Sequence, residues 1–437
     1  MSAATGCVKA LTAREILDSC GRPTVWAQCR LAGGAVGAAS VPSGKSTGAA
    51  EALELRDGEN NRYGGLGCRR AVSNVAGEIA RAVAGKAFGA QADFDAAVLA
   101  LDGTPNKARL GANAILAASI AFARACAAEQ ALPLYRYFAR MIGREPTHLP
   151  RMTINLFSGG KHAGGQVAIQ DLLIVPAGAT TIDAGLAAAY AVFQAAAQIV
   201  GERFHVRLLR ADEGGLAPPF TASEQLLACG VEAIRATGLR PGADVALAVD
   251  VASSHFFAGG TYQLDASPAP ALTAAAMIAA LAGWADRYPV VSVEDGLAEE
   301  DWAHWPALRS ALGARADGAP AVLCLGDDFL CTNPARIARA VREKACDALL
   351  LKVNQIGTLT EAARARTLAA EAGWMVTVSA RSGETEDDWL ADLAVGWGAD
   401  QIKIGSITQS ERLAKYNRLL AIEQETRLPV TGWPAQR

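Results

Sequence analysis

Residues Ala243–Asp250, ADVALAVD, form a short apolar run that stops on a carboxylate, as a buried strand of an α/β protein does. Five later runs have the same form, and each leads into a charged or hydroxyl residue. They are Pro289–Val293 before Glu294, Ala321–Gly326 before Asp327, Ala348–Leu351 before Lys352, Trp374–Ser379 before Arg381 and Ser382, and Ala399–Ile402 before Lys403. Longer helical stretches separate the runs, so the sequence from about residue 150 predicts a mostly parallel sheet or an α/β barrel. In a barrel the ends of these strands meet on one face, where such enzymes place their chemistry.

Two earlier segments add candidates for the same face. The run His205–Leu209 is predicted as a further strand leading to Asp212 and Glu213. The run Val167–Val175 carries Gln170 and Asp171.

The first 140 residues have a different pattern. Two strand-like segments are predicted at Pro23–Leu31 and Gly34–Val41, with a glycine turn between them. Helices are predicted at Glu51–Arg56, Cys68–Ala84, Asp93–Leu101 and Gly111–Glu129. With Gly143–Pro150 as a linker, the sequence predicts an N-terminal α+β domain over residues 1–140 and a barrel over 141–437.

Composition argues against several classes of protein. The chain has 437 residues, 51% hydrophobic and 19% charged, which is enough to bury large cores. Its 41 basic and 44 acidic residues give a net charge of -3, so no basic excess points to nucleic acid. The start shows no signal peptide, and the uncharged stretch Ala184–Gly201 is Ala-rich and typical of a packed helix rather than a membrane span. Nine scattered cysteines without a C-x-x-C pair indicate a reduced, cytoplasmic protein.

Three carboxylates at neighbouring strand ends, Asp250, Glu294 and Asp327, predict a metal site. Unpaired carboxylates facing one another repel, and a hard cation among them removes that cost. Oxygen-only ligands favour magnesium or manganese over zinc. The alternative is that each carboxylate caps the helix after it.

Lysines and an acid complete the predicted chemistry. Lys352 and Lys403 would lie close to the cation, and a lysine crowded by positive charge loses proton affinity and can act as a general base. The alternative is that the lysines simply pair with the carboxylates. Glu213 lies in a Gly-rich segment that could bring it over the site as an acid.

Two Gly-rich segments need separate interpretations. Gly44–Thr47 looks like the end of a phosphate-binding P-loop, but Ala39 stands where the first glycine belongs and Pro42 interrupts the loop. A flexible lid over an anionic site fits better. His162, flanked by glycines, is predicted on an exposed loop with a catalytic or anion-binding role, although a lone histidine is more often structural.

Taken together, these segments resemble the enolase family over nearly the whole chain. The matching stretches are Pro42–Gly44 with Ser46–Gly48, Asn106–Leu116 (NKARLGANAIL), Asp212–Pro218 (DEGGLAP), Ser292–Asp295, Lys352–Leu359 (KVNQIGTL), Arg381–Asp387 (RSGETED) and Ser410–Asn417 (SERLAKYN). The resemblance implies an N-terminal α+β domain, an eight-stranded α/β barrel, and a dimer or larger homo-oligomer.

The resemblance also implies roles for individual residues. Asp250, Glu294 and Asp327 would hold the first of two Mg²⁺ ions, and Ser46 would help hold the second, which arrives with a small phosphorylated carboxylate substrate. Lys403 would remove the α-proton, Glu213 would help expel the hydroxyl, and Lys352 would stabilise the charged intermediate. The remaining residues would bind the phosphoryl group (Arg381 and Ser382) or line the pocket (His162 and Gln170). A lysine base with one or two Mg²⁺ ions is a known arrangement of the enolase superfamily, so these roles rest on the resemblance.

Departures from the family pattern cluster at the site. Ala380 stands where the family has His, Asp171 where it has Glu, and Lys45 where it has Ala. Other differences are Cys20, Arg22, Val251, His255 and Ile404. Ala380 would open space beside the phosphoryl-binding pair, and Lys45 would add positive charge on the lid.

Three functional hypotheses follow. The first is Mg²⁺-dependent dehydration of 2-phosphoglycerate or a close analogue to a phosphoenolpyruvate-type product. The second is a paralogue from phosphonate-antibiotic biosynthesis that forms carboxyphosphonoenolpyruvate, in which Lys45 pairs with an extra carboxylate. The third is a catalytically inactive binding protein, against which the intact ligand and lysine set argues.

Overall fold

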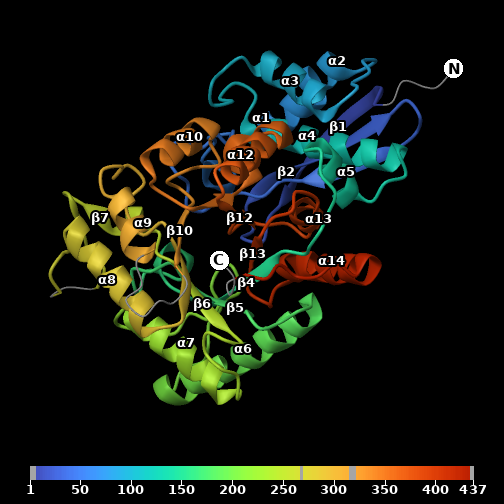
Figure 1. The fold of residues 1–437 in the computed structure, drawn as a ribbon. Coiled ribbons are helices and arrows are strands. Elements are labelled where there is room, and N and C mark those ends of the chain that lie inside the picture. Colours follow the sequence, from blue (N-terminus) through green and yellow to red (C-terminus); the bar gives the residue numbers. More distant parts are fainter. Residues whose placement is uncertain (1–5, 266–268, 314–320, 434–437) are drawn as a thin grey trace.

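The computed structural model describes residues 6–265, 269–313 and 321–433. A small three-stranded sheet with helices packed on it precedes a closed eight-stranded barrel with helices on its outside (Figure 1). The predicted α/β fold class, with an α+β domain before an eight-stranded barrel, is therefore confirmed.

The N-terminal sheet is an antiparallel meander. Its strands are β1 (Val8–Leu17), β2 (Pro23–Leu31) and β3 (Val36–Ser40). The sequence pattern did not predict β1, because most of its residues are exposed or half-buried and its charged residues interrupt the apolar pattern. The helices of this domain are α1 (Arg69–Asn74), α2 (Ala80–Val83), α3 (Gln91–Asp102), α4 (Ala112–Glu129) and α5 (Leu134–Met141). A π-helical turn at Val75–Ile79 joins α1 to α2, so the predicted helix at Cys68–Ala84 is one continuous helical segment.

The prediction of a helix at Glu51–Arg56 was wrong. This segment is extended, and its backbone bonds to distant segments: Ala52 N–H donates to Gln355 O and Leu53 N–H to Asn106 O, both at 2.8 Å. Partners from other parts of the fold thus replace the bonds that a local helix would have made.

The barrel closes in chain order. Its strands are β4 (Arg151–Ser158), β5 (Asp171–Val175), β6 (Ala246–Asp250), β9 (Val290–Glu294), β10 (Leu323–Gly326), β11 (Ala348–Leu351), β12 (Met375–Ser379) and β13 (Gln401–Gly405). The six runs predicted as barrel strands are β6 and β9 to β13. The larger helices on the outside are α6 (Ile182–Phe204), α7 (Glu224–Ala236), α8 (Ala274–Arg287), α9 (Trp305–Gly313), α10 (Pro334–Glu343), α12 (Leu359–Glu371), α13 (Trp389–Gly396) and α14 (Ser410–Thr426).

One barrel strand runs against the others. β5 pairs antiparallel with both β4 and β6, and Asp171, its first residue, lies opposite Asp250, the last residue of β6. Asp250 in turn pairs with Glu294 at the end of β9. Because β5 is reversed, the residue at its start lies at the same barrel end as the residues that finish the parallel strands.

The predicted strand at His205–Leu209 does not form. These residues follow the end of α6 as an irregular segment, and Val206 and Leu209 are 41% and 68% exposed. The barrel is already closed by eight strands, so this apolar run has no sheet edge to join.

Two helices, α4 and α6, are long and apolar enough to cross a membrane by length and composition alone, which is weak evidence. Most of α4 is buried against the N-terminal sheet, while α6 packs through residues such as Val192 and Phe193 on the barrel. Both positions are those of helices packed in a globular fold. All nine cysteines are free, as expected from their scattered spacing.

The contact between β3 and α4 leaves no room for a side chain at Gly37. A Cβ there would lie 2.2 Å from Ala125 N and 2.4 Å from Ala121 O. We expect Gly37→Ala to lower the free energy of unfolding by about 1–3 kcal/mol, because backbone must move to relieve the overlap. Urea denaturation measures this, with Gly201→Ala as the control. Gly201 lies within α6 and its Cβ would meet nothing within 4 Å, so that change should stabilise by about 0.5–1 kcal/mol. Equal effects of the two substitutions would contradict the packing argument.

Candidate active site

Three buried carboxylates lie at one end of the barrel. Asp250 and Glu294 finish β6 and β9, and Asp327 directly follows β10. Lys403 on β13 reaches between two of them: its Nζ donates to Asp250 Oδ2 at 2.7 Å and to Glu294 Oε2 at 2.8 Å. Residues far apart in sequence thus converge where the strand-end pattern placed them.

The second lysine, Lys352, forms an ion pair with the third carboxylate, Asp327. Lys352 donates to Asp327 Oδ2, and Gln355 Nε2 donates to Asp327 Oδ1 at 2.9 Å. The alternative interpretation, in which lysines pair with the carboxylates, therefore describes this structure. Burial disfavours a charged Lys403, but Asp250 and Glu294 outweigh burial and hold the pKa of Lys403 well above its usual value. The protein side chains alone do not produce the predicted loss of proton affinity at Lys403. That loss requires additional positive charge near Lys403, such as a bound cation.

The residues present fit a hard divalent cation such as Mg²⁺. Every donor of the predicted triad is a carboxylate oxygen. Burial and the charge of Asp250 raise the pKa of Glu294 well above its usual range. A bound cation would therefore stabilise the ionised form of Glu294. Gln170 Oε1 and Asp328 Oδ1 are buried oxygens without a hydrogen-bond donor among the described residues. Gln170 also donates from Nε2 to Asp250 Oδ2 at 3.2 Å, which orients that carboxylate.

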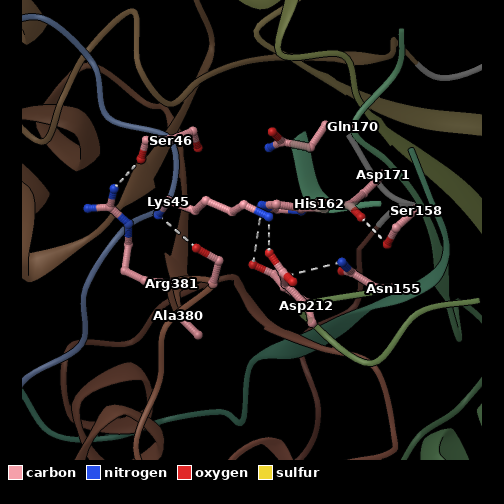
Figure 2. Close-up of polar contacts among 12 residues, drawn as sticks. Lys45, Ser46, Asn155, Ser158, His162, Gln170, Asp171, Asp212, Ala380 and Arg381 are labelled. Atoms are coloured by element: carbon pink, nitrogen blue, oxygen red, sulfur yellow. Dashed lines mark hydrogen bonds and ion pairs between the residues drawn. The ribbon is translucent and has the colours of Figure 1, made fainter. Parts of the chain in front are cut away.

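A histidine and two carboxylates, His162, Asp171 and Glu213, form a second group at the same end. Figure 2 shows His162 beside Asp171. His162 Nδ1–H donates to Asp171 Oδ2 at 2.8 Å, and Ser158 donates to Asp171 Oδ1 at 2.5 Å. His162 Nε2 lies 4.0 Å from Glu213 Oε1. Burial disfavours the imidazolium, yet Asp171 and Glu213 raise the pKa of His162 to about 9. His162 is buried, so its predicted exposed position was wrong: the glycine loop folds inward over the barrel end.

Glu213 is held from two sides. Asn155 Nδ2 donates to its Oε2 at 3.0 Å, and His162 lies beside its Oε1. Burial acts to raise the pKa of Glu213, but the positive charges led by His162 and Arg412 outweigh it and lower the pKa. Glu213 is therefore ionised here, and a role as proton donor requires that it first receive a proton.

The lid segment lies against the predicted phosphoryl-binding pair. Lys45 N–H donates to Ser382 Oγ at 2.8 Å, and Arg381 Nη2 donates to Ser46 O at 2.7 Å. Lys45 Nζ reaches across to Asp212 Oδ2 at 2.8 Å, next to Glu213 (Figure 2). Arg381 also pairs with Glu51, whose carboxylate raises the pKa of the guanidinium.

Some supporting residues were not predicted from the sequence. Asp295 Oδ1 and Oδ2 accept the N–H groups of Asp327 and Asp328, both at 2.8 Å, and the three carboxylates lie close enough to share a cation. The sequence feature that could have identified Asp295 is its position directly after Glu294. Asn155 and Ser158 lie on β4, whose C-terminal end carries no charged residue that would mark it in the sequence. Their roles depend on their tertiary contacts with Glu213 and Asp171.

Two protein-family models match the chain. The model described as "Enolase, N-terminal domain" matches residues 8–138, and the model described as "Enolase, C-terminal TIM barrel domain" matches residues 146–429. The first match ends within α5 and the second begins before β4. The second match contains the strand-end carboxylates and both lysines.

Proposed function

Since the chain belongs to the enolase family, we propose that it is an Mg²⁺-dependent lyase that dehydrates 2-phosphoglycerate or a close analogue to a phosphoenolpyruvate-type enol ester. The observation that supports this best is the convergence of Lys403 and Glu213. Both are buried at the same barrel end, and the charge of Lys403 lowers the pKa of Glu213. A base and an acid in one site are what removal of a proton and a hydroxyl requires.

In this proposal Asp250, Glu294 and Asp327 hold one Mg²⁺, and Ser46 helps to hold a second that enters with substrate. The bound cations supply positive charge for the doubly charged carboxylate of the deprotonated substrate. Lys403, in its neutral form, accepts the α-proton at Nζ. The roles of the other residues follow from their contacts.

Glu213, after taking up a proton from water, donates it to the hydroxyl, which leaves as water, while Asn155 and His162 orient its carboxyl group. Lys352 adds positive charge beside Asp327. Arg381 and Ser382 bind the phosphoryl group. The lid is held against this pair by two hydrogen bonds, from Lys45 N–H to Ser382 Oγ and from Arg381 Nη2 to Ser46 O. Gln170 and Asp171 hold Asp250 and His162 in place.

A second candidate substrate carries an additional anionic group at phosphorus, as in formation of carboxyphosphonoenolpyruvate. The supporting observation is Lys45, whose side chain is 40% exposed and engaged only by Asp212 among the described acids. Ala380, a small and buried residue, directly precedes Arg381. An extra carboxylate could take the Lys45 ammonium from Asp212.

The direct test is turnover. Purified protein incubated with Mg²⁺ and 2-phosphoglycerate should form phosphoenolpyruvate. Phosphorus NMR measures the rate at which this product appears. Fast conversion supports 2-phosphoglycerate as substrate, whereas slow conversion with fast turnover of the carboxylated analogue supports the second candidate. No turnover of either, with Mg²⁺ bound, would support the third hypothesis, a non-catalytic binding protein.

We also propose that the protein is a cytoplasmic homodimer or larger homo-oligomer. Sedimentation would test its oligomeric state.

Lys45→Ala separates the two substrates. If Lys45 binds the extra carboxylate, kcat/KM for the carboxylated analogue should fall roughly tenfold, the value of one partly exposed charge-assisted hydrogen bond, while 2-phosphoglycerate is unaffected. Lys161→Ala, at another exposed lysine on a neighbouring loop, is the matched control. Equal losses with both substrates would exclude this role.

A further inference from the structure

A cavity of about 470 Å³ lies at the barrel end opposite the active site. Its wall includes Met375, the first residue of β12, and Asp400, directly before β13. The proposed catalytic residues lie at the opposite ends of the barrel strands. Arg144 and His148, between α5 and β4, also line it, as does Trp433 near the C-terminal end of the described chain. Enzymes of this fold use this face for stability, so a built polar cavity here needs another explanation.

Arg366 on α12 is the central feature of this cavity. It is 6% exposed, and its Nε has no hydrogen-bond partner among the described residues. The bond that its Nη2 donates to Gly398 O is long, at 3.5 Å. Within the described ranges no carboxylate lies at salt-bridge distance from its guanidinium, which is costly for a buried charge.

A second arginine converges on the same point. Arg144 Nη2 and Arg366 Nη2 each lie 3.8 Å from the position that a Cβ would take on Gly398. Burial and the charge of Arg144 lower the pKa of Arg366 to about 10. The nearby Asp400 opposes this shift, but its Oδ2 is already engaged by Val376 N–H at 2.9 Å. Like charges held this close favour an anion between them.

A further polar side chain, His148, lines the cavity. His148 Nε2 is buried without a partner in the described part of the chain, while its Nδ1 contacts Thr147 Oγ1 at 3.1 Å. Trp374 and Trp433 supply apolar walls. The cavity thus combines two guanidinium groups, one unpartnered imidazole nitrogen and aromatic surface, a combination that suits an anionic group attached to a small organic molecule.

We propose that this cavity is an anion-binding site, in which Arg144 and Arg366 together bind the phosphate or carboxylate group of a small metabolite. The site is separate from the phosphoryl-binding pair at the catalytic end, and it does not depend on the proposed reaction. Arginine's planar donor fork makes it the side chain best suited to such groups.

Inorganic phosphate is the probe, and isothermal titration on the full-length protein is the measurement. We expect two phosphate sites per chain, one at each end of the barrel. Arg144→Gln should weaken one of them about tenfold to a hundredfold and leave turnover unchanged. Arg144 is exposed, so this substitution does not threaten folding. Arg366→Met should abolish the same site, and Arg30→Gln, at an exposed arginine on β2, should change neither.

The position is tested by tungstate soaked into crystals of the wild-type protein. Anomalous density between the two guanidinium groups, absent in Arg366→Met, would support the proposal. Unchanged phosphate affinity in Arg144→Gln would overturn it, as would tungstate bound only at Arg381 and Ser382. Loss of binding in Arg366→Met alone would also contradict a site built by both arginines.

Discussion

Lys403→Met should reduce turnover by roughly 10²- to 10⁴-fold, the contribution of a positioned general base. Its Nζ is the group proposed to accept the α-proton, and methionine fills similar space without a proton acceptor. Exchange of the substrate α-hydrogen with deuterated water should fall in parallel with product formation. Proton NMR of the substrate measures the first and phosphorus NMR the second. Retained exchange would assign the base to another residue.

The same substitution should have a large effect on stability that depends on the divalent cation. Lys403 is the counter-ion of Asp250 and Glu294, and its removal leaves two buried carboxylates facing each other. Breaking a buried pair in this way costs about 3–5 kcal/mol, so unfolding in EDTA should occur at lower urea concentration. Mg²⁺ should restore more stability to this variant than to the wild-type protein. Lys161→Met is the control, and an equal response of both variants to Mg²⁺ would argue against a cation site at these carboxylates.

Glu213→Gln should separate the two halves of the reaction. The amide keeps the size of the side chain and its place beside Asn155, but it cannot deliver a proton to the leaving hydroxyl. We expect product formation to fall by roughly 10²- to 10⁴-fold while α-hydrogen exchange with deuterated water continues, because Lys403 is intact.

The pair of variants makes this prediction sharp. Lys403→Met should stop both exchange and dehydration, whereas Glu213→Gln should stop only dehydration. Wild-type rates of dehydration in Glu213→Gln would remove Glu213 from the proposed acid role. Loss of exchange in both variants would instead indicate that Glu213 helps to position the substrate for Lys403.

Much of the barrel could be predicted from local pattern. Buried parallel strands are apolar over their whole length, and the residue that follows each one stands out as charged, so Asp250, Glu294, Asp327, Lys352 and Lys403 were visible as a set. The same reasoning failed for β1, whose faces are half-exposed, and for His205–Leu209, an apolar run that the fold leaves at the surface. Local hydrophobicity indicates a strand only when the fold provides a partner for it.

Pairing across the sequence depended on the tertiary structure. Asp171 reaches the active end only because β5 is antiparallel, a direction that the apolar run itself does not encode. The pairing of Lys403 with two carboxylates, the inward fold of His162, and the contact of Lys45 with Asp212 depend on distances between segments. The sequence alone established the chemical groups available and the barrel end at which most of them lie. Which charges neutralise one another was set by the closed barrel, because electrostatic pairing depends on separation in space and on burial, and local sequence specifies neither.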